Sequence, residues 1–250
     1  LIAVGCRFSD RVALQPDTFA SQAKIVHIDI DRSEIDKNVL TDHHIIGSAK
    51  RVLELLNERL PQYRHEEWKA HILPLREKQP EEEGEKLTPG QILDAIVATD
   101  VGQHQMWSIQ HFHFNYPGQL LTSGGFGTMG FGLGAAMGAA VGNPGKVVVQ
   151  CTGDGCFRMN CHELATVEHY HLPIITVVFN NGTLGMVRQW QHLIYHEHYS
   201  QTTLDRGPDF VKLAEAYGLS GYRVRTRAEM AQALAQALQS GRGAVIDCML

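Results

Sequence analysis

One stretch near the middle of the chain constrains its fold more than any other. It runs Lys146-Val-Val-Val-Gln-Cys-Thr-Gly-Asp-Gly155 and leads, after a more polar segment, to Leu172-Pro-Ile-Ile-Thr-Val-Val-Phe-Asn-Asn181. Val147–Val149 and Ile174–Phe179 are short apolar runs rich in β-branched residues, typical of strands buried on both faces. Residues 160–170 leave room for a helix of about three turns. The pattern predicts a right-handed strand-helix-strand crossover with parallel strands.

Polar residues at the ends of these two strands predict a ligand site. Gly153-Asp154-Gly155 and Asn180-Asn181 fall at the carboxyl ends of parallel strands, where open α/β sheets bind ligands. Glycines let the backbone approach a phosphate closely, and the N-terminus of the following helix favours negative charge. Asp154 and Asn181 add hard oxygen ligands of the kind that Mg²⁺ shares with phosphates and water. The spacing predicts a magnesium-diphosphate site.

This spacing resembles the thiamine diphosphate motif, and further segments narrow the resemblance. Val101–Trp107, Leu121–Gly130 and Leu184–Gln191 are similar to the large catalytic subunit of acetolactate synthase, as is Ile25–Asp31. The resemblance covers nearly the whole chain. It implies an α/β fold, in which a parallel-sheet, Rossmann-like thiamine diphosphate-binding domain is preceded by the end of a second nucleotide-binding-like domain.

The resemblance and the composition divide the chain into three parts. Residues 1–60 are expected to be the C-terminal part of a central, FAD-associated domain. Residues 61–86 have the charged composition of a linker, partly helical around Trp68. Residues 87–250 are expected to form the thiamine diphosphate-binding domain.

The hydrophobic pattern also predicts the other elements of the chain. They are a buried strand at residues 1–5, further strands at 23–29 and 44–47, an amphipathic helix at 48–60, a helix that begins near Thr88 and ends at Asp100, a loop at 101–107, a glycine-rich turn at 123–130 that leads into a helix of small residues, helices at 209–217 and 228–240, and a closing strand at 244–248.

The resemblance implies thiamine diphosphate and Mg²⁺ as cofactors of the second domain. Asp154, Asn181 and the Thr183 carbonyl would bind Mg²⁺, and Trp190 would shape the pocket for the second substrate. Met129 would lie under the thiazolium ring. The residues expected to bind thiamine diphosphate are Val101, Gly102, Gln103, His104, Gly127, Met129, Gly153, Asp154, Gly155, Cys156, Asn181, Thr183, Gly185, Met186 and Val187.

FAD is the cofactor that the resemblance implies for the first domain. Asp29 follows a nucleotide-fold strand, where a carboxylate commonly meets a ribose hydroxyl. The alternative is that Asp29 merely ends a strand and begins a turn. Ser48 departs from the family, which usually has aspartate there. The residues expected to contact FAD are Gly5, Arg7, Ser9, Arg11, Val12, Asp29 and Ile30.

The implied reaction is the decarboxylating condensation of pyruvate with a second 2-keto acid, pyruvate or 2-ketobutyrate, in branched-chain amino acid biosynthesis. The family implies a homodimer of catalytic subunits, with a small regulatory subunit as a further possible partner. Its activating glutamate comes from an N-terminal domain of the other subunit, so no catalytic residue is expected in this chain. We therefore expect residues 1–250 alone to be an inactive fragment.

Other functions stay open at this point. The chain could belong to another thiamine diphosphate-dependent decarboxylase or carboligase, or be a non-catalytic fragment that keeps the cofactor-binding fold. Gly125–Gly130 matches the G-x-G-x-x-G pattern of an NAD-binding protein, but no clear strand is predicted before it. His192 and His196 have helical i, i+4 spacing and, with His198, could bind a metal or form a polar helix face.

Composition excludes several classes of protein. The formal net charge of -5 and the lack of a long basic block argue against a nucleic-acid surface. The small-residue segment Gly124–Gly142 has too few large apolar side chains to favour lipid. The 5 cysteines show no paired spacing, which favours free thiols, with Cys156 and Cys161 as packing residues. With no signal peptide in the sequence, we expect a cytoplasmic protein.

Overall fold

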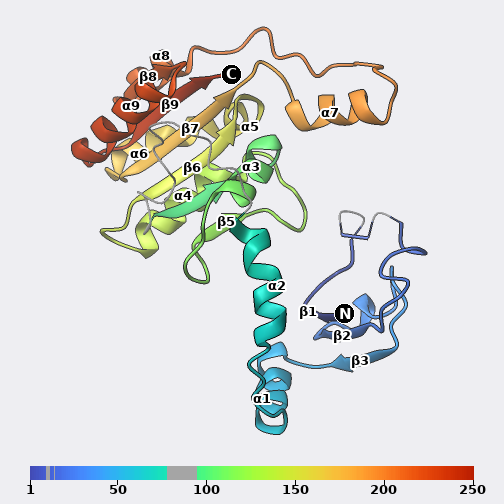
Figure 1. Ribbon diagram of the computed structural model, residues 1–250. Coiled ribbons are helices and arrows are strands. Elements are labelled where there is room, and N and C mark those ends of the chain that lie inside the picture. The colour runs from blue at the N-terminus through green and yellow to red at the C-terminus, as the bar shows by residue number, and fades with distance from the viewer. Residues whose placement is uncertain (10–11, 14, 78–94) are drawn as a thin grey trace. The chain divides into compact units, whose positions relative to one another are not determined.

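The computed structural model describes residues 1–9, 12–13, 15–77 and 95–250 (Figure 1). The chain forms two compact units, Leu1–Glu81 and Glu82–Leu250. Each is described by itself below.

The described part of the N-terminal unit is built on a parallel sheet in the order β1-β2-β3. Its strands are β1 (Ile2–Val4), β2 (Val26–Asp29) and β3 (His43–Ile46), and the 3₁₀ turn η1 (Arg32–Glu34) follows β2. The helices α1 (Ala49–Arg59) and α2 (Glu66–Glu77) come after β3. Predicted strands and the amphipathic helix are therefore present, with Val52, Leu55 and Leu56 half-buried on one face of α1.

The prediction of a buried first strand is wrong for this chain. Ala3 is buried, but its neighbour Ile2 is 68% exposed. Among the described strands β1 pairs with β2 on one side, so it is an edge strand of this sheet. The same alternation places Ala3 in a small core with Phe8 and Ile25.

The C-terminal unit contains a parallel sheet whose described strands have the order β5-β4-β6-β7-β9-β8. Its strands are β4 (Ile96–Thr99), β5 (Leu120–Thr122), β6 (Val148–Gly153), β7 (Ile174–Asn180), β8 (Ser220–Val224) and β9 (Ala244–Met249). Its helices are α3 (Gln103–His111), α4 (Phe131–Gly142), α5 (Asp154–Asn160), η3 (Cys161–Glu163), α6 (Leu164–His169), α7 (Gly185–Leu193), α8 (Phe210–Ala216) and α9 (Arg227–Ser240).

The predicted strand-helix-strand unit is confirmed, with a shift in its helix. Val148 of β6 lies level with Ile174 of β7 in a parallel ladder. The helical segment begins at Asp154, directly after β6, and the 3₁₀ turn η3 divides it into α5 and α6. The sequence pattern predicts that this helix begins only at residue 160. Because Gly153 is extended and serves as the N-cap, the chain passes from strand to helix without a loop.

Three local predictions in this unit are wrong. Residues 96–99 form the strand β4 and not the end of a helix at Asp100; the predicted start near Thr88 lies outside the described residues. The helix α3 begins at Gln103, within the loop predicted for residues 101–107, and continues to His111. The strand β5 ends at Thr122, shortly before the Gly125–Gly130 turn. The expectation that no strand precedes this G-x-G-x-x-G match is therefore wrong.

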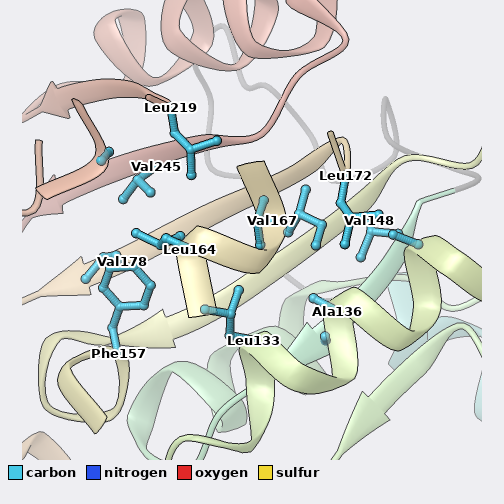
Figure 2. Close-up of a cluster of buried hydrophobic side chains, with 14 of the residues drawn as sticks. Leu133, Ala136, Val148, Phe157, Leu164, Val167, Leu172, Val178, Leu219 and Val245 are labelled. Atoms are coloured by element: carbon cyan, nitrogen blue, oxygen red, sulfur yellow. The ribbon is translucent and has the colours of Figure 1, made fainter. Parts of the chain in front are cut away.

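Alternating side chains of the central strands build a core on each face of the sheet. Val148 and Ile174 belong to the core on one face, together with residues of α4, α6 and α8. Figure 2 shows Val148 in this core with Ala136 of α4 and Val167 of α6. Val149 and Ile175 point to the other face, where α9 supplies Ala233, Leu234 and Ala237. The sheet is therefore covered on both faces, and its strand ends remain as the place for a ligand.

The helix α4 contains the small residues that raised the question of a membrane span. Leu133 and Ala136 are buried against the sheet, on the face that Figure 2 shows. Among the residues described, no helix combines the length and the apolar character that crossing a membrane requires.

Candidate functional site

Three neighbouring strands bring the candidate residues together. β4, β6 and β7 are adjacent and parallel, so their carboxyl ends lie at one edge of the sheet. Asp100 and the start of α3 follow β4, Gly153 ends β6, and Asn181 follows β7. Residues far apart in the sequence are therefore gathered at the edge where open α/β sheets bind ligands.

A pocket opens at this edge. It is lined by Val101, Gly102, Gln103, His104, Trp107, Met129, Gly153, Asp154, Gly155, Cys156, Phe179, Asn181, Thr183, Leu184, Gly185, Met186 and Val187. Of the residues expected to bind thiamine diphosphate, Gly127 is the one that does not line this pocket. Trp190 does not line it either and is 46% exposed on α7.

Asp154 supplies the carboxylate of the pocket. It is the first residue of α5 and is only 2% exposed. Burial raises the pKa of this carboxyl above its usual value, against hydrogen bonds from backbone groups such as the Gly155 N–H and the nearby charge of Arg158. Its Oδ2 atom is buried and has no hydrogen-bond partner among the described residues. Such an atom is costly to bury unless a cation or a donor pairs with it.

His104 is buried beside the same pocket, although a loop histidine is usually exposed. Its ring packs so closely that a β-carbon on Gly102 or Gly153 would lie 2.8 Å from Cε1 or 2.9 Å from Nδ1. Burial lowers its pKa to about 4, against the opposing effects of the Asp100 charge and backbone. The ring is therefore neutral at pH 7, and its Nε2 atom is buried without a hydrogen-bond partner in the described structure.

A tight turn after β7 forms a further part of the pocket wall, with Asn181, Thr183 and Leu184. The Asn181 Oδ1 atom accepts hydrogen bonds from the Thr183 N–H at 3.0 Å and from the Thr183 hydroxyl at 3.2 Å. Gly182, between them, has a φ of 66°, a left-handed conformation that favours glycine. Leu184 then donates its N–H to the Thr202 carbonyl at 2.8 Å, which fixes the chain at the start of α7.

The pocket also contains residues that the sequence did not single out. Trp107 and Phe179 lie with ring centroids 6.0 Å apart, and Phe179 also stacks on His104 at 6.4 Å. Trp107 follows His104 by three positions on α3, a spacing that places both on one helix face. That signal was lost because this segment was predicted as a loop.

Cys156 lines the pocket as a buried side chain with little reactivity. Its thiol donates to the Val101 carbonyl at 3.0 Å. Burial, and after it the Asp100 charge, raise the pKa of the thiol to about 12. A thiol in this state is a packing residue.

His192 and His196 do not share a helix face, which corrects the i, i+4 interpretation. α7 ends at Leu193, and His196 lies beyond it with a φ of 49°. His192 Nδ1 instead lies 2.9 Å from the Tyr199 hydroxyl and 3.2 Å from the Glu197 carboxylate. Within the described ranges, no group of three or more histidine, cysteine and acidic side chains is placed to hold a metal ion.

The residues expected to contact FAD lie in the N-terminal unit, apart from Arg11, which is outside the described residues. Gly5, directly after β1, donates its N–H to the Ile28 carbonyl of β2 at 2.9 Å. Asp29 ends β2 and accepts the Asp31 N–H at 2.9 Å. Both therefore lie at the carboxyl edge of this sheet, while Val12 and Ile30 are exposed. The Asp29 contact is also the one that a simple turn would make.

Comparisons with known proteins agree with this architecture. The family model "Thiamine pyrophosphate enzyme, C-terminal TPP binding domain" matches residues 100–248, and the model of the central domain of thiamine pyrophosphate enzymes matches residues 1–56. Thiamine pyrophosphate is another name for thiamine diphosphate.

Two curated relatives are named as large subunits of acetolactate synthase. The chain is 41% identical to the "Probable acetolactate synthase large subunit" of Methanocaldococcus jannaschii, over 100% of this chain and 46% of that protein. It is 42% identical to the "Acetolactate synthase isozyme 2 large subunit" of Escherichia coli, over 96% of this chain and 45% of that protein. It thus spans about half the length of these relatives. The first family model covers more than half of the chain, and the chain therefore belongs to the thiamine pyrophosphate enzyme family.

Proposed function

We propose that the pocket of the C-terminal unit binds thiamine diphosphate with Mg²⁺, and that the protein is the large subunit of an acetolactate synthase. The observation that carries the proposal is a pair of buried polar atoms in one pocket, Oδ2 of Asp154 and Nε2 of His104, which have no hydrogen-bond partner among the described residues. The names of relatives at 41% and 42% identity support the activity.

The pocket fits a magnesium-diphosphate group. Oδ2 of Asp154 is buried without a hydrogen-bond partner among the described residues, and a divalent ion would offset the unfavourable effect of burial on the charge of this carboxylate. Asn181 Oδ1 and the Thr183 carbonyl would complete the protein's share of the coordination sphere. Diphosphate oxygens and water would supply the rest, as Mg²⁺ usually requires.

Other pocket residues would hold and orient the cofactor. Gln103 and His104, on the first turn of α3, would contact the diphosphate. Met129 would support the thiazolium ring, because its flexible, polarizable side chain suits contact with an aromatic group. Gly185, Met186 and Val187 would line the aminopyrimidine, and Val101, Gly102, Gly153, Gly155 and Cys156 would form the remaining wall.

Bound thiamine diphosphate would supply the electron sink for decarboxylating one 2-keto acid and joining it to another. The chain's own residues bind the cofactor, orient it and exclude water from it. Trp190, half-exposed on α7 beyond the pocket lining, would contact the second 2-keto acid, pyruvate or 2-ketobutyrate. The product would serve branched-chain amino acid biosynthesis.

The proposal extends to FAD and to partners. Gly5, Arg7, Ser9, Arg11, Val12, Asp29 and Ile30 would contact FAD in the N-terminal unit, with Gly5 and Asp29 placed at the carboxyl edge of its sheet. Asp154 is the one carboxylate among the described pocket-lining residues, and it would be engaged with Mg²⁺. The activating glutamate would therefore come from elsewhere, in a homodimer of catalytic subunits that a small regulatory subunit could join.

A product assay tests the proposed function. The intact gene product that carries this chain is incubated with thiamine diphosphate, Mg²⁺, FAD and pyruvate, and its products are identified. Acetolactate supports the proposal. Acetaldehyde or acetyl phosphate would assign the chain to another branch of the thiamine diphosphate enzymes, and cofactor binding without any turnover would make it a non-catalytic binding protein.

A further inference from the structure

A buried carboxylate lies behind the candidate metal site, outside the pocket lining. Asp247 is on β9 and is only 1% exposed. Its Oδ1 atom accepts a hydrogen bond of 2.8 Å from the Asn180 side-chain amide, and its Oδ2 atom accepts one of 3.2 Å from Arg223 Nε. Asp247 therefore joins the last residue of β7 to an arginine on β8.

Toward the surface, this network ends in a second carboxylate. Arg223 donates from Nη2 to Asp209 Oδ1 at 2.7 Å. Asp209 is the N-cap of α8 and also accepts the N–H groups of Val211 and Lys212. The guanidinium thus bridges two carboxylates, one buried and one partly exposed.

Toward the pocket, the network ends next to a proposed metal ligand. Asn180 directly precedes Asn181, whose side-chain oxygen organises the turn through Thr183. The Asn180 carbonyl accepts the Leu250 N–H at 3.0 Å, so both the main chain and the side chain of Asn180 are fixed.

Stability alone gives little reason for a charge at position 247. Burying an ion pair in a sheet costs desolvation energy that its Coulomb attraction often fails to exceed, and an apolar side chain could fill such a place. The carboxylate instead fixes the orientation of its neighbours, because its two oxygens accept hydrogen bonds from the side chains of Asn180 and Arg223.

We propose that Asp247 is a positioning residue for the magnesium-diphosphate site, which holds Asn180 so that Asn181 and the Thr183 carbonyl point into the pocket. This inference rests on the proposed cofactor site and adds a residue that touches neither cofactor nor substrate. Groups that orient metal ligands from behind in this way commonly change metal affinity when they are replaced.

The test compares two substitutions that remove the same charge from the two ends of one network. Asp247→Asn keeps the shape but replaces one of the two carboxylate oxygens with an NH₂ donor, which cannot accept the hydrogen bond that Asn180 or Arg223 donates to that position. Asp209→Asn also removes a carboxylate from Arg223, while asparagine remains a good N-cap for α8. Mg²⁺ is titrated by calorimetry into each purified protein at saturating thiamine diphosphate, and the apo-protein Tm is recorded as a measure of folding.

The inference predicts that Asp247→Asn raises the Kd for Mg²⁺ about tenfold or more, while Asp209→Asn stays within about twofold of wild type. Equal Kd values for wild type and a folded Asp247→Asn protein would overturn it, and so would equal weakening by both variants. If Asp247→Asn does not fold, Asn180→Ala decides: tenfold weakening supports the inference and an unchanged Kd overturns it. A wild-type protein that binds no thiamine diphosphate with Mg²⁺ would overturn the proposed function itself.

Discussion

The backbone of Gly185 lies directly against the side chain of Gln103. A β-carbon at position 185 would overlap with Gln103 Oε1 and would lie 2.9 Å from Asn181 Nδ2. Gly185 opens α7, and Gln103 opens α3, where its Nε2 donates to Gln189 Oε1 at 3.1 Å. The two helices thus meet at the pocket through a contact from which a β-carbon at position 185 would displace the Gln103 side chain.

We predict that Gly185→Ala weakens thiamine diphosphate binding about tenfold, because the new β-carbon would displace the Gln103 side chain in the pocket, and a steric change of this kind costs roughly 1–3 kcal/mol. Calorimetric titration of the protein with thiamine diphosphate, with Mg²⁺ present, measures this affinity. Gly138→Ala on α4 is the matched control: a β-carbon there meets no atom within 4 Å, so affinity should not change and helix propensity should raise the Tm. Undiminished affinity in the Gly185 variant would show that the contact plays no part in binding.

A second prediction concerns pH and His104. Burial lowers the pKa of His104 to about 4, so between that pH and about 6.5 the unfolded chain binds more protons than the folded one. The free energy of unfolding should therefore fall as the pH falls through this window, by about 3 kcal/mol from this residue. Urea denaturation of the apo protein at pH 7, 6 and 5 should show that the free energy of unfolding falls more steeply with falling pH for wild type than for His104→Gln. Parallel profiles would contradict the prediction.

A third prediction tests the core that carries the site. Phe157 is 1% exposed and packs edge-on against Phe210, with ring centroids 5.4 Å apart. Phe157→Ala should lower the free energy of unfolding of this unit by about 3–5 kcal/mol, through lost burial and the cavity that remains. Phe126 is 94% exposed, so Phe126→Ala should change the free energy of unfolding by less than about 0.5 kcal/mol. Similar urea midpoints for the two variants would contradict the packing described here.

Much of this fold could be predicted because its central strands are apolar on both faces. The runs around Val148 and Ile174 have no other stable placement than a covered parallel sheet, and they are the strands β6 and β7. α3 was missed for the opposite reason. Its buried residues are His104 and Gln105, so the apolar periodicity that normally reveals a helix is absent. The strand β4 is a four-residue apolar run, too short for periodicity to separate strand from helix.

The candidate site could be predicted only where its residues follow strand ends. Asp154 and Asn181 were found because each comes directly after a recognisable strand. Trp107 and Phe179 were not found, since their meeting depends on α3 and on β4 lying beside β6, and sheet order is not encoded in any local pattern. Asp247 was missed because nothing in a closing strand marks a buried acid as paired.

A fourth prediction concerns residues 1–250 as an isolated polypeptide. With Asp154 as the one carboxylate among the described lining residues, it should form no acetolactate from pyruvate with thiamine diphosphate, Mg²⁺ and FAD, because no second carboxylate is placed to activate the cofactor. Turnover at a rate usual for such enzymes would show that a carboxylate able to activate the cofactor lies within this sequence.

The central claim is that Asp154 and Asn181 hold Mg²⁺ and diphosphate in the pocket at the ends of β6 and β7. The most direct measurement is the Kd for thiamine diphosphate in the presence of Mg²⁺, determined by calorimetry for wild type and Asp154→Ala. Loss of a buried charge-assisted contact should weaken binding by roughly 100-fold, corresponding to about 3 kcal/mol. The expected result is measurable binding by wild type and a Kd for Asp154→Ala that is larger by this factor. Equal affinities of two folded proteins would contradict it.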